Sequence, residues 1–197
     1  MKQTVKCLYS LLVLSLILTV SCSIDYDEAM VAEELSEELP DIIIYDFTQV
    51  QVKDGKPAYR IMGEEAKMYE KKQEHTISSL LFQEFNEEGE IITEGWADEV
   101  LFFTVSEDAE LKGDLDFYSK TEEGSISAEY LYWQKENSIL KSNAEEPVTL
   151  REDSGSSITG TGFEADFDNK QIYFTGPTEG TWVEEEEEET EDESEIQ

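Results

Sequence analysis

The sequence predicts an all-β fold of stacked antiparallel hairpins, and two observations carry this prediction. From Ile42 onward, short stretches rich in Val, Ile, Tyr, Phe and Trp alternate with turn-forming pairs such as Asp54-Gly55 and Asp168-Asn169. A short motif around an alanine also recurs, placing Ala66, Ala97 and Ala128 at intervals of 31 residues. Evenly spaced strands with short turns fit a sandwich, a barrel or a solenoid. The repeat favours hairpins that stack over one continuous interior.

The expected strands follow one another with little between them. They cover 42–52, 57–69, 76–86, 90–104, 109–119, 125–134, 138–143, 147–152, 157–167 and 171–183. No long helical pattern interrupts them, so we expect one β-domain over 42–183.

The N-terminus has the pattern of a secretion signal. Lys2 and Lys6 precede an apolar run to Ser21, which is shorter than a full membrane span and typical of a signal peptide. The run ends in Leu-Thr-Val-Ser-Cys22, which resembles a bacterial lipobox and implies a lipid on Cys22. The alternative is an uncleaved single span from Val5 to Ile24. Either way, we expect residues 1–22 to anchor the rest of the chain outside the cytoplasm.

The charge is concentrated at the two ends of the chain. The whole sequence has 48 acidic and 14 basic residues, a net charge of -34, which excludes binding to nucleic acid and to anionic lipid through a basic patch. Residues 23–41 read as an acidic, extended spacer, although a short amphipathic helix over 29–39 is an alternative. Residues 184–197 carry ten acids and no base, and we expect a disordered acidic tail.

Alternation within the expected strands sorts side chains into an inner and an outer face. The expected inner rows are Trp96, Val100 and Phe102; Leu111, Gly113, Leu115 and Phe117; Ile126, Ala128, Tyr130 and Tyr132; and Phe163, Ala165 and Phe167. The expected outer positions are mostly charged, with Leu101, Phe103, Tyr118 and Trp133 as bulky exceptions. Such rows form either an ordinary packed core or a groove that accepts lipid.

Residue types that support catalysis are scarce. The only histidine, His75, suits a turn or a strand start, and the only cysteines, Cys7 and Cys22, lie in the signal. This removes disulfides, thiolate sites and multi-histidine metal sites, and no nucleophile elbow or phosphate-binding loop occurs. We therefore expect no enzyme activity, no cofactor and no metal.

The order of several short motifs along the chain resembles that of the LptC family, which belongs to the wider LptA/LptC/OstA group of lipopolysaccharide-transport proteins. The resemblance covers about 42–183 and follows an N-terminal anchor. Its motifs are Asp46-Phe47-Thr48, Asp54-Gly55-Lys56, Tyr59-Arg60-Ile61, Ala66-Lys67-Met68-Tyr69, the recurring Ala-Asp/Glu strand starts, residues 158–166 and residues 172–176.

The resemblance implies a twisted, V-shaped β-jellyroll that holds acyl chains between its two walls without any catalytic residue. The residues expected to line the groove are Val100, Phe102, Leu115, Phe117, Tyr130, Tyr132, Phe163, Phe167 and Phe174. The implied ligand is lipopolysaccharide or another amphipathic glycolipid. The implied partners are an inner-membrane lipopolysaccharide-export ABC transporter and an LptA-like periplasmic protein, joined edge to edge.

Two features of this sequence differ from the pattern of the family. A lipid on Cys22 differs from the uncleaved helix usual in the family, and the six glutamates at 184–189 adjoin the expected docking edge. These glutamates would either repel a strand that pairs with this edge or attract a basic partner to it. The alternative function is a membrane-anchored surface lipoprotein whose closed β-domain binds a protein partner.

Overall fold

The computed structural model describes residues 38–183. The expected signal or anchor (1–22), nearly all of the acidic spacer and the acidic tail (184–197) lie outside the described residues. The chain divides at Leu39/Pro40, and the β-domain that follows is described here by itself. Among residues 38–183, no helix has the length and apolarity needed to cross a membrane.

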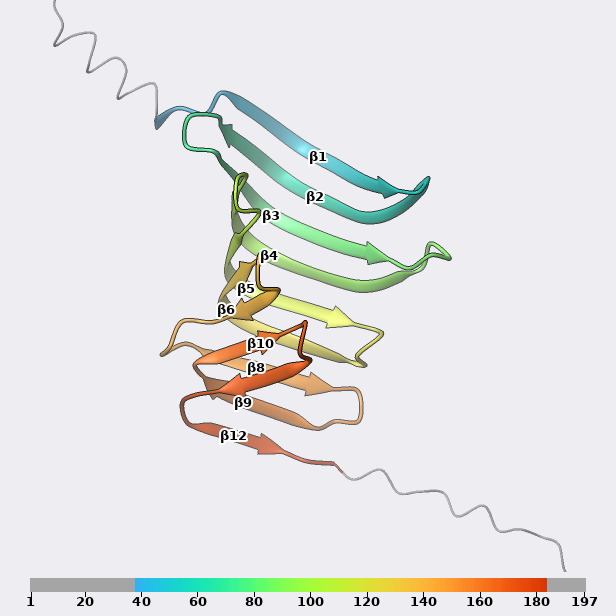
Figure 1. Ribbon diagram of the computed structural model, residues 1–197, viewed down its shortest axis with the longest axis vertical. Coiled ribbons are helices and arrows are strands. Elements are labelled where there is room, and N and C mark those ends of the chain that lie inside the picture. Colours follow the sequence, from blue (N-terminus) through green and yellow to red (C-terminus); the bar gives the residue numbers. More distant parts are fainter. Residues whose placement is uncertain (1–37, 184–197) are drawn as a thin grey trace, which may run out of the picture. The chain divides into compact units, whose positions relative to one another are not determined.

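The all-β prediction is confirmed, and the described residues form one antiparallel sheet of twelve strands. The strands are β1 (Ile42–Lys53), β2 (Lys56–Tyr69), β3 (Glu74–Phe85), β4 (Ile91–Phe103), β5 (Ala109–Ser119), β6 (Gly124–Gln134), β7 (Ile139–Lys141), β8 (Pro147–Glu152), β9 (Ser157–Thr161), β10 (Phe163–Asp166), β11 (Gln171–Phe174) and β12 (Thr178–Thr181). From the top of Figure 1, β1 to β6 stack in chain order. The sheet then branches, with β7, β10 and β11 on one path and β8, β9 and β12 on the other.

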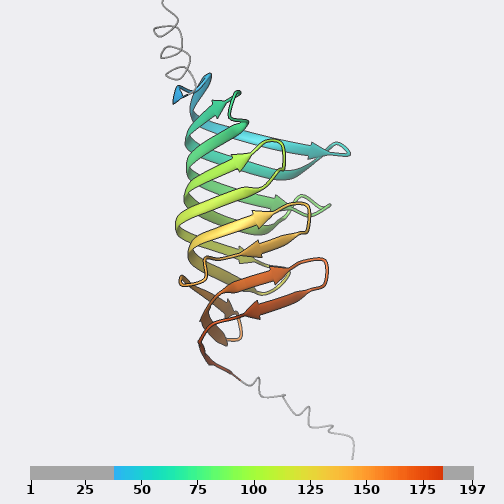
Figure 2. The ribbon, with the colours of Figure 1, turned by 60° about the vertical axis from the view of Figure 1, so that its left-hand side comes forward.

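Each long strand bends near its middle, so the sheet forms two arms. β6 shows this most clearly, because its first half pairs with β8 and its second half pairs with β7. Arm A is the set of strand halves that end in the turns 70–73, 104–108, 135–138 and 167–170, and it ends at β11. Arm B is the set that ends in the turns 54–55, 86–90, 120–123 and 153–156, and it ends at β12. Figure 2 shows the strands bending along one side and the two arms extending from that bend.

The sequence produces the bend with residues that interrupt the strands. The register of β4 against β5 breaks between Trp96 and Glu99, and that of β5 against β6 breaks between Lys112 and Leu115. At the bend Asp46, Ser79 and Asp114 have φ of 48°, 52° and 47°, a region that L-residues other than Asn and Asp seldom occupy within strands. Such an irregularity turns the strand and adds a residue without a cross-strand partner.

The bend also explains why two expected strands are each divided. The range 157–167 was expected as one strand, but Gly162, with φ of 63°, separates β9 in arm B from β10 in arm A. The range 171–183 likewise divides at Gly176-Pro177 into β11 and β12. Periodicity along the sequence cannot reveal such a corner, because both halves keep a strand pattern.

The core lies between the arms. Its buried members come from β3 to β10 and are Leu80, Ala97, Val100, Leu115, Leu131, Val148, Phe163 and Ala165. Phe174 of arm A closes the C-terminal part of the bend, since a Cβ on Gly160 of arm B would lie 2.6 Å from its ring. The Phe174 ring also lies 5.5 Å from that of Phe163, between centroids.

Candidate functional site

The inner face of arm A carries two apolar rows in direct cross-strand register. The first row consists of Ile44, Ala66, Ile77, Val100, Leu111 and Leu131. The second consists of Ile42, Met68, His75, Phe102, Ala109, Trp133, Leu140, Ala165 and Ile172. Cross-strand partners lie on the same face of a sheet, so both rows face the core from β1 to the C-terminal strands.

The inner face of arm B has matching rows. Next to the bend lie Leu80, Ala97, Leu115, Ala128, Val148 and Gly160, and further out lie Ile61, Phe82, Gly95, Phe117, Ile126, Leu150 and Ile158. The Phe82 and Phe117 rings approach to 6.5 Å across Gly95, over which the Phe117 ring lies directly. The outermost inward positions are polar, with Glu84 and Thr93 joined by a hydrogen bond of 2.9 Å.

Six of the nine residues expected to line the groove lie among the inward-facing apolar side chains. Val100, Leu115 and Phe163 are buried in the core, and Phe117 and Phe174 pack against it partly exposed. Phe102 is half-buried in the second row of arm A, where its ring lies 6.3 Å from the His75 ring. His75 itself is the second residue of β3, as expected of a strand-start position.

Phe167 lies apart from these six, in the turn after β10. It is 57% exposed, and its ring meets the edge of Trp133 at 5.7 Å. This contact places it at the free end of arm A.

The predicted face is wrong for Tyr130 and Tyr132. They pair with Lys112 and Glu110, whereas Leu131 between them pairs with Leu111. Tyr132 also lies under the Lys141 ammonium, 5.2 Å from the ring centroid. Both tyrosines therefore belong to the charged outer face.

The cause is the unpaired residue at the bend. In β6, Ala128 pairs with Leu115 and Tyr130 with Lys112, so Glu129 has no partner and the alternation changes face there. Even-numbered residues face inward before Glu129 and odd-numbered residues after it. The same change makes two further expectations wrong, because Trp133 faces inward and Trp96, 48% exposed, faces outward.

Leu131 was missed for this reason, whereas Ile61, Met68, Ile77, Phe82 and Leu150 lie in strands for which no inner row was predicted. A signal was present in hindsight, because each long strand carries a charged or small polar residue in its middle. Those residues include Asp46, Glu64, Ser79, Asp98, Asp114 and Glu129. A polar residue in the middle of the strand with a shift in alternation marks the bend of β2, β3, β4 and β6, whereas in β5 two residues lack a partner and the alternation keeps its phase.

The inner rows differ in accessibility along the stack. Leu115, Leu131 and Val148, in the middle, are at most 2% exposed. In β1 no residue is buried, and the inward-facing Ile42 and Ile44 are 46% and 38% exposed. The space between the arms is therefore filled in the middle and accessible at the β1–β2 end.

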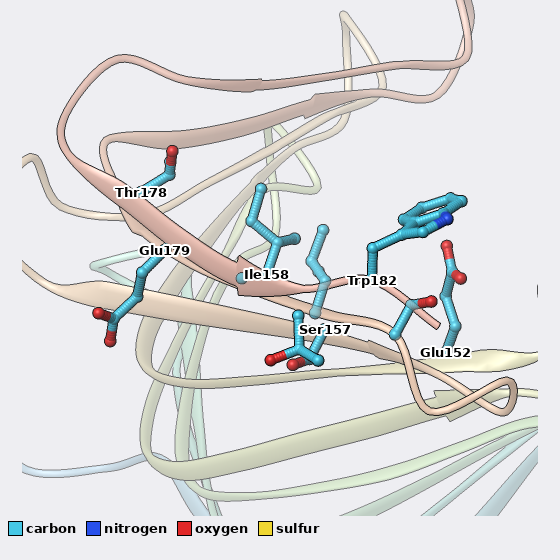
Figure 3. A pocket seen from close by; sticks show the side chains of 10 residues that line it. Glu152, Ser157, Ile158, Thr178, Glu179 and Trp182 are labelled. Atoms are coloured by element: carbon cyan, nitrogen blue, oxygen red, sulfur yellow. The ribbon is translucent and has the colours of Figure 1, made fainter. Parts of the chain in front are cut away.

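A cavity of about 350 Å³ lies at the opposite end, along β8, β9 and β12. Figure 3 shows Trp182 and Glu152 at one end of it, Thr178 and Glu179 at the other, and Ile158 between them. The Ser156 hydroxyl fixes this end, because it accepts a hydrogen bond of 3.1 Å from the Val183 N–H.

Asp108, in the turn before β5, is an acidic group with clear hydrogen-bond donors. Asp108 accepts hydrogen bonds from the Lys135 N–H at 2.8 Å and from the Tyr132 hydroxyl at 2.9 Å, and the former contributes most to lowering the pKa of Asp108. Burial raises the pKa of Tyr130. Across residues 38–183, no three His, Cys, Asp or Glu side chains gather in a way that could hold a metal ion.

Comparison with known proteins identifies the family of the chain. A family model described as "Lipopolysaccharide-assembly, LptC-related" matches residues 9–182. Among solved structures, the chain is similar to LptH of Pseudomonas aeruginosa, described as the LptA-homologous periplasmic component of the lipopolysaccharide transport device. The identity is 9%, the TM-score is 0.28, and the match covers 76% of this chain and 99% of LptH. No curated protein matches. Because the family model spans most of its length, the chain belongs to the LptC family.

Proposed function

We propose that the protein is a non-enzymatic carrier of lipopolysaccharide or a related amphipathic glycolipid on the periplasmic side of the cell envelope. The observation that carries this proposal is the set of apolar rows that line both arms, in a chain of the LptC family. Acyl chains would contact these rows and gain about 25 cal/mol per Å² of apolar surface removed from water.

The accessible part of the inner face supports a specific place for the acyl chains. Ile61, Phe82 and Phe117 in arm B, and Met68 and Phe102 in arm A, are inward and only partly buried. The packed middle around Leu131 offers no comparable room. We therefore place the acyl chains toward the end of the domain formed by β1 to β5.

Photo-crosslinking tests this placement with adjacent residues as matched controls. A photoreactive amino acid at Phe82 or Phe102 should capture lipopolysaccharide in cells, whereas one at the outward neighbours Leu81 or Leu101 should not. Tyr132 is a further outward control. Equal capture from inward and outward positions would overturn the proposal.

Transfer to a partner would use the ends of the stack. β1 begins the sheet, and β11 and β12 end the two arms, so each has one edge without a strand partner among the described residues. Exposed edges can add a strand from another protein. An LptA-like periplasmic protein at one end and the membrane transporter at the other would complete such a bridge.

A lipid on Cys22 would hold the domain at the membrane, and an uncleaved span from Val5 to Ile24 is the alternative. Labelling cells with a clickable fatty acid separates them. Loss of label in Cys22→Ala supports the lipoprotein, whereas a wild-type chain that never takes up label supports the span.

The packed middle favours a second candidate function. With Leu115, Leu131 and Val148 at most 2% exposed, the domain could be a closed lipoprotein that binds a protein partner. Native mass spectrometry of the full-length protein extracted from membranes distinguishes the two functions, because a closed domain should carry no acyl lipid beyond its own anchor.

A further inference from the structure

The cavity at the C-terminal end of arm B lies apart from the rows proposed for acyl chains. It runs along β8, β9 and β12, and the packed middle around Leu131 and Val148 lies between it and β1 to β5. On the side of the bend, a Cβ on Gly160 would lie 2.6 Å from both the Phe174 ring and the Thr178 methyl group. These side chains fill that side, so the cavity is a separate site.

The floor of the cavity is apolar because of a glycine in β12. Ile158 pairs with Gly180, which has no side chain to cover it, and Ile158 is 37% exposed. A Cβ on Gly180 would lie 2.6 Å from the Ser157 carbonyl oxygen, so the backbone leaves no room for a larger residue there. Leu150, the partner of Ile158 in β8, continues the apolar surface.

Trp182 stands at one end of this floor, on a backbone that is held in place. The Ser156 hydroxyl, 4% exposed, accepts the 3.1 Å hydrogen bond from the N–H of Val183, the residue after Trp182. The Trp182 side chain lines the cavity and is nevertheless 76% exposed. Its indole face is therefore available to a ligand, and indole faces attract cations.

Glu152 lies at the same end of the cavity as Trp182 (Figure 3). Its Oε2 accepts a hydrogen bond of 3.1 Å from the Ser154 hydroxyl, which orients the carboxylate. Its Oε1 has no hydrogen-bond partner among the described residues. Glu179 adds a second carboxylate at the other end.

The charge around the cavity favours a cation. Among the described residues that line it there is no Lys or Arg. Arg151, next to Glu152 in β8, donates a hydrogen bond of 3.1 Å to Ser127 on the outer face. Residues 147–183 contain six Asp and Glu against two Lys and Arg. An anionic head group is therefore repelled here, and a cationic one is attracted.

We propose that this cavity binds an amphiphile with an ammonium head group and a short alkyl stem. The ammonium lies between the Trp182 indole and the Glu152 carboxylate, where cation–π attraction and ion pairing act together. The stem covers Ile158 and Leu150. The site is independent of the proposed carrier function, because it lies outside the rows assigned to acyl chains.

Fluorine NMR reports on this cavity directly. The chain contains three tryptophans, so 5-fluorotryptophan gives three signals, and Trp182→Leu assigns the one from the cavity. In full-length protein held in nanodiscs of an uncharged glycolipid, n-octyltrimethylammonium should shift the Trp182 signal alone. The uncharged n-octyl glucoside has the same stem and should bind about tenfold more weakly at low salt, and the difference should shrink at high salt.

Two variants with the same change in charge locate the head group. Glu152→Gln should reduce the preference for the ammonium probe to about threefold or less, because the ion pair is lost, and should leave binding of octyl glucoside unchanged. The control is Glu164→Gln on the outer face of β10, which should keep the full preference.

Three results would overturn the site. The first is equal affinity for the two octyl probes, or an equal loss of preference in both variants. The second is a shift of all three tryptophan signals, which would show partition onto apolar surface in general. The third concerns tetramethylammonium, which has the head group without the stem and should compete weakly. Competition as strong as that of the octyl probe would show a simple cation site and overturn the amphiphile.

Discussion

The first hairpin and the middle of the stack share one row of inward side chains, but these side chains differ in burial. Ile44 of β1 and Leu131 of β6 occupy one continuous inner row of arm A, but Ile44 is 38% exposed and Leu131 is 1% exposed. In the middle the row meets the other arm and forms a core, whereas at β1–β2 it meets solvent. Position along the stack therefore decides whether an apolar row is packed into a core or remains exposed to solvent.

Truncating these two side chains gives the largest expected difference. Leu131→Ala should lower the free energy of unfolding by about 2–5 kcal/mol, because it leaves a cavity in a packed site. Ile44→Ala should cost about 1 kcal/mol or less, because that side chain is already partly hydrated. Urea unfolding followed by tryptophan fluorescence measures both. Similar losses would mean that the first hairpin is packed like the middle.

Two glycines extend the comparison to the backbone. Gly162 has φ of 63° at the C-terminal bend, and a Cβ there would overlap the Thr175 hydroxyl, so Gly162→Ala should cost about 3 kcal/mol. Gly55 has φ of 81° in the β1–β2 turn with no atom within 4 Å of a Cβ, and Gly55→Ala should cost only about 1 kcal/mol. Thermal unfolding of both variants checks this, and a reversed order would contradict the closed bend.

Substitutions at the bend should change stability according to how well the new residue adopts a positive φ. Ser79, in the middle of β3, has φ of 52°, so the β-branched Ser79→Val should cost about 1–2 kcal/mol, while Ser79→Gly should cost nothing or stabilise slightly. Urea midpoints report the difference. If valine were tolerated, Ser79 would not be the residue that turns β3.

The smallest expected effect is on how the free energy of unfolding changes with pH through the carboxyl group of Asp108. Hydrogen bonds, chiefly from the Lys135 N–H, lower the pKa of Asp108 below its ordinary 3.8. A lowered folded pKa means that the stabilisation is present above pH 3.8 and is lost as the pH falls through the folded value. Asp108→Asn should therefore have a lower free energy of unfolding than the wild type at pH 7. Between pH 7 and pH 3, the free energy of unfolding of the variant should fall by less than that of the wild type. Parallel pH profiles would contradict a stabilising role of the carboxylate.

Much of the architecture was predictable from the chain alone. The strands and turns follow from β-branched and aromatic runs between Gly, Asn and Asp, and these local preferences are strong in short antiparallel hairpins. The inward placement of Leu111, Leu115 and Phe117 also followed, since β5 has two unpaired residues at its bend and its alternation keeps the same phase in both halves.

The predicted faces of Tyr130, Tyr132, Trp96 and Trp133 were wrong for one reason. Alternation determines which residues share a face only while every residue has a cross-strand partner. One unpaired residue exchanges the two faces. Because β6 carries large side chains on both faces, its residue types do not show where this exchange occurs.

The sequence by itself determined the β-class, the repeat and the acidic ends, because these depend on residue type and order. Only the tertiary structure decided where the strands bend, which face of each half meets the core, and that the interior is filled around Leu131 yet accessible beside Ile44. The physical reason is that burial depends on the opposite arm, whose residues are distant in the sequence and come near only when the sheet folds over on itself.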